Sequence, residues 1–294
     1  AMRLLVCMLP ITVSALVLAA ARAEDGSDLK STVRDNYVEE VEAARLAEVQ
    51  ESGSLQPLDA YSHFMSAREL QDLGATPSAA AFAIPLPDQG IYIRIPVFHV
   101  QTTAQVQQAV QAVLAQGPVS DVVLDLRGNR GGLLNAAVEV ADEFVAQGTL
   151  AQTSGRADTA NLVFLAKPGG LLTGSPVAVL IDAKTASAAE LLAGILQRND
   201  KGLLVGRSSF GKSAVQSRFA LDNGESLSLT TAYYRFSDGS TVSPQGLPPD
   251  AVLPSWAMRR KPPLPGAENG KTLLAEDAAV RKARELLRQT KTPR

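Results

Sequence analysis

The segment DVVLDLRGNRGGLLNAAVEVADEFV, residues 121–145, decides the fold of this chain. Its first six residues, DVVLDL, predict a buried strand, and residues 133–146 have the spacing of a helix with one apolar face. Between them lie Gly131 and Gly132, where backbone N–H groups can face a cavity at the positive end of a helix dipole. This order of strand, glycine turn and helix is typical of α/β folds.

The same alternation continues on both sides of this segment. The predicted elements are strands at 90–95, 121–126, 176–182 and 202–206 and helices at 103–115, 133–146 and 187–198. Right-handed crossovers between such strands produce a mainly parallel sheet. Residues 213–221 and 225–236 alternate in polarity around Asp222-Asn223-Gly224, which predicts an antiparallel hairpin.

Shorter elements are expected before and after this α/β region. Residues 28–51 are charged and helix-prone, and a second helix is predicted at 66–73, where Ser66 and Glu69 have the spacing of a capping box. Residues 74–88 are rich in Ala and Pro, which favours a linker. A closing amphipathic helix is predicted at 272–289.

The first 23 residues have the pattern of a signal peptide. Arg3 precedes an apolar run that ends in Ala21-Arg22-Ala23, a small-x-small cleavage pattern. We therefore expect export, with the bacterial periplasm as the destination; an uncleaved membrane anchor is the alternative, because the run nearly spans a bilayer. The single cysteine, Cys7, lies inside this segment, so the exported chain would need no disulfide.

Charge and composition exclude several classes of function. The net charge is −2 without basic clusters, which argues against a nucleic-acid partner. His63 and His99 are the only histidines, so a metal site or a Ser-His-Asp triad has little support. No cofactor is expected.

Two loops that follow predicted strands could carry chemistry. The N–H groups of Gly131 or Gly132 could hold a developing oxyanion, although a plain glycine turn is the simpler interpretation. In IDAKTASAAEL, residues 181–191, Ser187 and Glu190 fit a capping box, but a serine at a helix start after a buried strand also resembles a nucleophile. The N–H of Ala188 would then be a second oxyanion donor.

A nucleophilic serine needs a base, and no histidine is suitably placed. Lys212, in VGRSSFGKSAVQ at residues 205–216, is a candidate, because burial would lower its pKa and leave a neutral amine. In an extended strand Gln216 would share a face with Lys212 and could orient it. The alternative is a solvated loop lysine.

Together these motifs resemble the carboxyl-terminal processing (tail-specific) proteases, serine peptidases of the Clp protease/crotonase superfamily. The resemblance covers roughly residues 30–73 and 90–253, and it rests on the following segments: DAYSHFMSAREL, DLRGNRGGLLNAAVEVADEFV, TASAAELLAGILQ, VGRSSFGKSAVQ and LSLTTAYYRFSDGSTVSPQGLPPD. It implies a Clp protease/crotonase-like α/β fold and a serine endopeptidase that cleaves protein or peptide substrates near flexible C-terminal tails. The implied site has Ser187 as nucleophile, Lys212 as general base, Gln216 as its partner, and oxyanion donors from Gly131 or Gly132 and from Ala188.

The resemblance also sets the expected domain organisation. We expect a signal peptide at 1–23, a helical region at 24–73, a linker at 74–89, a catalytic α/β domain at 90–255 and a Pro-rich segment with a C-terminal helix at 256–294. In the family a PDZ domain normally follows the D-x-Y-S motif, and the short linker here implies that it is missing. We therefore expect the N-terminal helices to mediate self-association or to bind a delivery or activator protein. The smaller departures, Arg130 and Ala189, are not positions of acyl transfer.

Two other functions remain open at this stage. A protease fold that has lost catalysis could serve as a binding protein, or could need a partner for activity. Ser209-Phe210-Gly211-Lys212 also matches the S-x-x-K motif of penicillin-binding enzymes. That motif requires a helix, whereas Gly211 lies inside it and a strand is predicted to follow.

Overall fold

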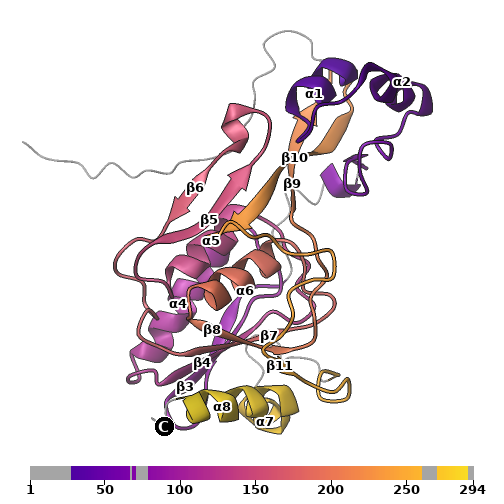
Figure 1. Cartoon of the computed structure of the whole chain (residues 1–294). Coiled ribbons are helices and arrows are strands. Elements are labelled where there is room, and N and C mark those ends of the chain that lie inside the picture. The colour runs from indigo at the N-terminus through magenta and orange to yellow at the C-terminus, as the bar shows by residue number, and fades with distance from the viewer. Residues whose placement is uncertain (1–27, 67, 71–78, 260–269, 291–294) are drawn as a thin grey trace, which may run out of the picture.

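Two β-sheets organise the chain in a computed structural model that describes residues 28–66, 68–70, 79–259 and 270–290 (Figure 1). The first sheet has the strand order β11-β8-β7-β4-β3-β2, and the second has the order β1-β10-β5-β6 with β9 paired to β10. The predicted signal segment 1–23 and most of the Pro-rich segment lie outside the described residues.

The first sheet confirms the predicted α/β class. Its strands are β2 (Phe82–Pro85), β3 (Gly90–Arg94), β4 (Asp121–Asp125), β7 (Val177–Ile181), β8 (Gly202–Gly206) and β11 (Ala251–Val252). All neighbouring pairs are parallel except β2 with β3. Strands β4 and β7 are buried throughout, which explains the continuous apolar sequence of β7 and the apolar centre of β4.

Helices cover both faces of the parallel sheet (Figure 1). One face carries α4 (Thr102–Leu114), α5 (Leu134–Asp142) and α6 (Ala188–Arg198), and the other carries α7 (Gly270–Glu276) and α8 (Ala278–Thr290). The closing helix predicted as one element is therefore two. The break falls at Asp277, whose Oδ1 accepts the N–H groups of Ala279 and Val280 at 2.9 and 3.2 Å and so caps α8.

The second sheet is antiparallel and contains the predicted hairpin. Its strands are β1 (His63–Phe64), β5 (Thr149–Ser154), β6 (Val163–Leu165), β9 (Ala214–Ala220) and β10 (Ser226–Phe236), with a short 3₁₀ turn at Asp158–Ala160 between β5 and β6. Strands β5 and β6 were not predicted from the sequence. Strand β6 has three residues at the sheet edge, with Val163 and Leu165 exposed, so it lacks the burial pattern by which strands are recognised.

Residues 28–66, here called the N-terminal arm, pack against β10. The helix-prone stretch forms two helices, α1 (Leu29–Asn36) and α2 (Ala43–Ser52), rather than one. They separate because the Val38 N–H leaves the helix to bond Thr230 O of β10 at 2.9 Å. The apolar side chains of the arm then form a separate core cluster with Leu227 and Leu229.

Part of the segment predicted to be a linker forms a strand. Residues 82–85, inside the predicted linker 74–89, form β2, which pairs with β3 at the edge of the parallel sheet. Residues 74–78 of the predicted linker lie outside the described residues. Among the helices in the described ranges, none is both long and apolar enough to cross a bilayer.

Candidate active site

Ser187 occupies a strained turn between β7 and α6. It is the N-cap of α6, with φ 55° and ψ −121°, a conformation that a residue with a side chain rarely adopts. A serine on a sharp turn between a strand and a helix presents its hydroxyl away from the sheet, as in the nucleophile elbow of serine hydrolases. The side chain of Ser187 is half-buried.

Glu190 connects the loop of Ser187 with the loop of Lys212. Its side chain is completely buried. Oxygen Oε2 accepts the backbone N–H of Ser187 at 2.8 Å and that of Lys212 at 2.9 Å. Oxygen Oε1 accepts the N–H of Gly211 at 2.6 Å and the hydroxyl of Ser209 at 2.5 Å. The capping box predicted from the sequence is thus only part of the role of this carboxylate.

Gly131 lies directly beside Ser187, and Gly132 lies against the backbone of Phe98. A Cβ on Gly131 would come within 2.9 Å of Ser187 Cβ and 3.0 Å of Ala188 N, so only a glycine fits there with φ +100°. The Gly131 N–H donates to Asn129 Oδ1 at 2.7 Å. By contrast, the hydrogen bonds of the described residues include none from the N–H groups of Gly132 and Ala188.

Asn129 fixes this loop against the serine loop, a role that the sequence analysis missed. It is fully buried, donates from Nδ2 to Ile95 O at 2.8 Å, and accepts the Ala186 N–H on its own carbonyl at 3.0 Å. Nearby, Thr185 Oγ1 donates to Leu126 O at 3.0 Å. The glycine loop and the serine loop are therefore one hydrogen-bonded unit. Asn129 gives no local sequence signal beyond its place in the glycine loop.

Lys212 lies on the other side of Glu190, with its side chain directed to the N-terminal arm. Its Nζ is 4.9 Å from the centre of the Tyr61 ring. Burial lowers the pKa of Lys212, and the carboxylate of Asp59 acts in the opposite direction. Gln216, the predicted partner of Lys212, donates instead from Nε2 to Thr230 Oγ1 at 3.2 Å.

The predicted residues thus come together in part. Gly131 lies against Ser187 and Ala188, and Glu190 joins the backbones of Ser187 and Lys212. The neighbouring Gly132 lies against Phe98. Within the part of the chain that the structure describes, no hydrogen bond joins Ser187 Oγ to Lys212 Nζ, or Lys212 to the side chain of Gln216.

The hydroxyl of Ser209, the serine of the S-x-x-K match, is held by two hydrogen bonds inside the protein. Its hydroxyl is buried, donates to Glu190 Oε1 and accepts the Leu247 N–H at 2.7 Å. It lies in a loop and not on a helix. A hydroxyl with both bonding directions occupied is poorly placed for attack, which argues against the penicillin-binding type of site.

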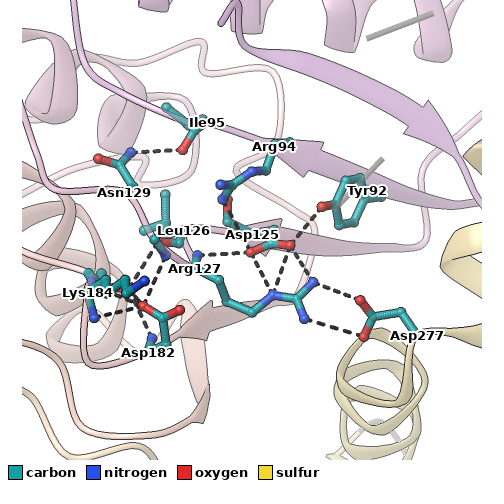
Figure 2. A network of polar contacts seen from close by, with 12 residues as sticks. Tyr92, Arg94, Ile95, Asp125, Leu126, Arg127, Asn129, Asp182, Lys184 and Asp277 are labelled. Carbon is teal, nitrogen blue, oxygen red and sulfur yellow. Dashed lines mark hydrogen bonds and ion pairs between the residues drawn. The ribbon is translucent and has the colours of Figure 1, made fainter. Parts of the chain in front are cut away.

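A buried ionic network lies at the carboxyl end of β4, where the chain enters the glycine loop (Figure 2). Arg127 pairs with Asp125 at 2.6 Å and with Asp277 at 2.9 Å, and Arg94 lies 3.4 Å from Asp125. Tyr92 donates its hydroxyl to Asp125 at 2.7 Å. Burial alone would raise the pKa of Asp125, but the guanidinium groups of Arg127 and Arg94 outweigh burial and lower that pKa.

In the described ranges, no group of three or more His, Cys, Asp or Glu side chains is arranged to hold a metal ion.

A serine in a strained turn between a strand and a helix is the kind of site that serine hydrolases use. The chain belongs to peptidase family S41, whose model matches residues 90–253. The family predicted from the sequence motifs is confirmed.

Several curated proteins are similar to this chain. The carboxy-terminal-processing protease of Bartonella bacilliformis is 37% identical over 165 residues, which are 55% of this chain and 38% of that protein. The carboxyl-terminal-processing protease of Synechocystis is 35% identical over 184 residues, 62% of this chain and 42% of that protein. This chain therefore spans about two fifths of the length of these relatives.

Solved structures show the same architecture. The photosystem II D1 C-terminal processing protease superposes with a TM-score of 0.56 at 30% identity, covering 76% of this chain and 54% of that chain. The predicted Clp protease/crotonase-like fold is thereby confirmed. A lipoprotein from Streptococcus agalactiae shares the fold at 16% identity, with a TM-score of 0.62 over 89% of this chain and 94% of that chain.

Proposed function

We propose that this protein is a serine endopeptidase in which Ser187 is the nucleophile and Lys212 the general base. The observation that carries the proposal is the shared carboxylate of Glu190, which accepts the backbone N–H groups of both residues. One buried group thus sets the separation between the two loops that would have to cooperate.

In the proposed reaction, neutral Lys212 takes the hydroxyl proton of Ser187, and Ser187 Oγ attacks the peptide carbonyl. The protonated Lys212 then gives this proton to the leaving amine as the C–N bond breaks, which leaves an ester on Ser187. Water, deprotonated by Lys212, hydrolyses the ester and restores the serine. The depression of the Lys212 pKa by burial supports the first step, because it increases the neutral fraction of the amine.

For the developing oxyanion we propose the N–H groups of Gly132 and Ala188. Both are unoccupied among the hydrogen bonds of the described residues, whereas the Gly131 N–H is bound to Asn129. Gly131 would instead provide the close approach to Ser187 that lets the two loops meet. Gln216 would orient Lys212 only after a change of its present bond to Thr230.

The substrate class follows from the relatives. Proteins that are 35–37% identical are named for carboxyl-terminal processing, so we propose protein or peptide substrates cleaved near flexible C-terminal tails. A tail can enter an active site without unfolding of the substrate. No cofactor takes part in the proposed mechanism.

The test compares four purified variants on an unfolded protein substrate and on peptides with free or amidated C-termini. Ser187→Ala and Lys212→Ala should each abolish cleavage, while Ser208→Ala and Lys184→Ala, exposed residues of the same two loops, should retain it. Circular dichroism shows whether the variants remain folded. Cleavage by the Ser187→Ala protein at the wild-type rate would disprove the assignment.

A second candidate is a protein that is silent until a partner rearranges the site. It is favoured because, among the hydrogen bonds of the described residues, none joins Lys212 Nζ to Ser187 Oγ. A fluorophosphonate serine probe separates the two candidates. Labelling of Ser187 in the isolated protein supports the active enzyme, and no labelling without a partner supports the silent one.

We also propose that the chain is exported through its first 23 residues, and that the N-terminal arm mediates self-association or binds a delivery protein. The small-x-small end of the apolar run supports export. Mass spectrometry of protein from a periplasmic fraction should find Glu24 as the first residue. Charge reversal at Glu48 and Glu51, exposed on α2, should change the molar mass measured by light scattering if this arm joins subunits.

A further inference from the structure

Tyr61 is the residue of the N-terminal arm that meets the side chain of Lys212. The ammonium nitrogen lies 4.9 Å from the centre of the Tyr61 ring, within the range of a cation–π interaction. Tyr61 lies just before β1, and Lys212 lies just before β9, far later in the sequence. The contact therefore depends on how the arm is attached to the rest of the molecule.

The loop that carries Tyr61 is fixed by Asp59. Its Oδ1 accepts the N–H groups of Tyr61 and Ser62 at 2.6 and 2.7 Å, and its Oδ2 accepts the Ser62 hydroxyl at 2.8 Å. Upstream, the hydroxyl of Tyr37 donates to Leu58 O at 3.0 Å. These bonds fix the position of the Tyr61 backbone, from which the ring reaches Lys212.

The same loop is attached to the strand pair that carries Gln216. The Thr230 N–H of β10 donates to Ser62 Oγ at 3.0 Å, and Thr230 Oγ1 accepts from Gln216 Nε2 at 3.2 Å. Ser62 and Thr230 are both almost fully buried. The arm is thus bonded to the residue next to Gln216, and it presents Tyr61 to Lys212 from a rigid base.

We propose that Tyr61 is a positioning residue for Lys212. The face of the Tyr61 ring holds the ammonium form of this base in place. The inference rests on the proposed role of Lys212 as the general base. In that role the lysine becomes charged when it takes the proton of Ser187, in a half-buried place where water solvates it poorly. The negative face of an aromatic ring stabilises such a charge without accepting its proton.

Charged groups also lie around Lys212, and an experiment must distinguish their effects on its pKa from that of the Tyr61 ring. Asp59 attracts the ammonium, and His63 on β1 is close enough that Lys212 lowers its pKa. For His63 itself, burial opposes the charged form, but bonds to Tyr61 O and Glu69 raise the pKa above its ordinary value. Glu190 faces the lysine with its carboxylate bound to the Lys212 backbone N–H. A pH readout should therefore be taken in a His63→Gln background.

The experiment compares Tyr61→Phe with Tyr61→Leu in the full chain. The phenylalanine keeps the ring face, so kcat and its pH profile should remain close to those of the parent. The leucine removes the ring, so kcat should fall about tenfold with KM little changed, and the acid limb of kcat should move down by about half to one pH unit. The downward direction follows because loss of the ring destabilises the ammonium and lowers the lysine pKa.

Phe64→Leu is the matched control, since Phe64 is a half-buried aromatic residue of the same arm, packed in its apolar cluster. It should lower stability without moving the acid limb. The inference is overturned if Tyr61→Leu leaves the limb in place, or if Tyr61→Phe loses as much kcat as Tyr61→Leu.

A second measurement keeps this inference separate from the proposed function. The pKa of Lys212, followed by NMR of ¹³C-methylated lysines assigned with Lys212→Arg, requires no turnover. A lower pKa in Tyr61→Leu supports the contact even if Ser187→Ala shows that cleavage arises elsewhere, and an unchanged pKa overturns it even if the enzyme is active.

Discussion

Ser187 and Lys212 donate their backbone N–H groups to the same oxygen of Glu190, at 2.8 and 2.9 Å. The carboxylate is fully buried, and its other oxygen is bonded to Ser209 and Gly211. Four donors therefore converge on one carboxyl group, two on each of its oxygens. The relative position of the two loops depends on this single side chain, which leads to the first prediction.

Glu190→Gln should destabilise the fold and reduce cleavage at least a hundredfold. The amide replaces one acceptor oxygen by a donor, so two N–H or O–H groups lose their partner at a cost of about 1–3 kcal/mol each. Urea unfolding and kcat/KM on a peptide measure the two effects. Glu139→Gln on the exposed side of α5 is the control and should change neither. Wild-type stability of Glu190→Gln would contradict the four-donor description.

Gly132→Ala should inactivate the protein, whereas Gly128→Ala should not. A Cβ on Gly132 would lie 2.0 Å from Phe98 O, and φ is +131°, so the loop must move. At Gly128, with φ +71°, nothing lies within 4 Å, and the cost is the left-handed backbone alone, about 1–2 kcal/mol. Cleavage and thermal melting of both variants check this. Equal activity of the two would show that the Gly132 N–H has no catalytic part.

Cleavage should increase with pH through the pKa of Lys212. The base must be neutral to take the serine proton, and the neutral fraction increases as pH rises through that pKa, which burial has lowered. Measured as kcat/KM at constant ionic strength, the rate should increase about tenfold per pH unit below the pKa. A profile that is flat from about pH 5 to 9 is incompatible with a lysine base.

Arg127→Met should unfold the protein at lower denaturant concentration than Arg130→Met. The methionine leaves Asp125 and Asp277 buried without their shared cation, a change that costs about 3–5 kcal/mol for buried pairs. Arg130 is exposed in the same loop and serves as the control. If both variants unfold together in urea, the network does not stabilise the loop.

Much of the parallel sheet could be predicted from the sequence, because β4 and β7 are buried on both faces: β7 is an unbroken apolar run, and β4 has three consecutive apolar residues between its two aspartates. The family motifs alone predicted Ser187 as the nucleophile and Lys212 as the general base. Only one of the four hydrogen bonds of Glu190 could be predicted from the sequence. The S-x-x-E spacing predicts the bond to the Ser187 N–H at the start of α6. The other three bonds join distant parts of the chain, and they go to Ser209, Gly211 and Lys212.

Other features depend on pairing between distant segments. Gln216 was expected to orient Lys212, whereas its side chain bonds to Thr230, the residue opposite it in the register of β9 and β10. The break between α1 and α2 likewise depends on the bond of Val38 to β10. No local pattern of residues encodes such contacts, which arise only when the sheets assemble.

The link between Arg127 and Asp277 has a consequence for the order of events during synthesis. The buried network contains two aspartates and two arginines, and its fourth member leaves the ribosome only after Ser187 and Lys212 have done so. A nascent chain without residue 277 carries an unbalanced cation beneath the glycine loop. We therefore expect ribosome-bound chains arrested before residue 270 to resist labelling by a serine probe, and chains released after residue 290 to accept it. Such a delay would protect a growing polypeptide from its own active site.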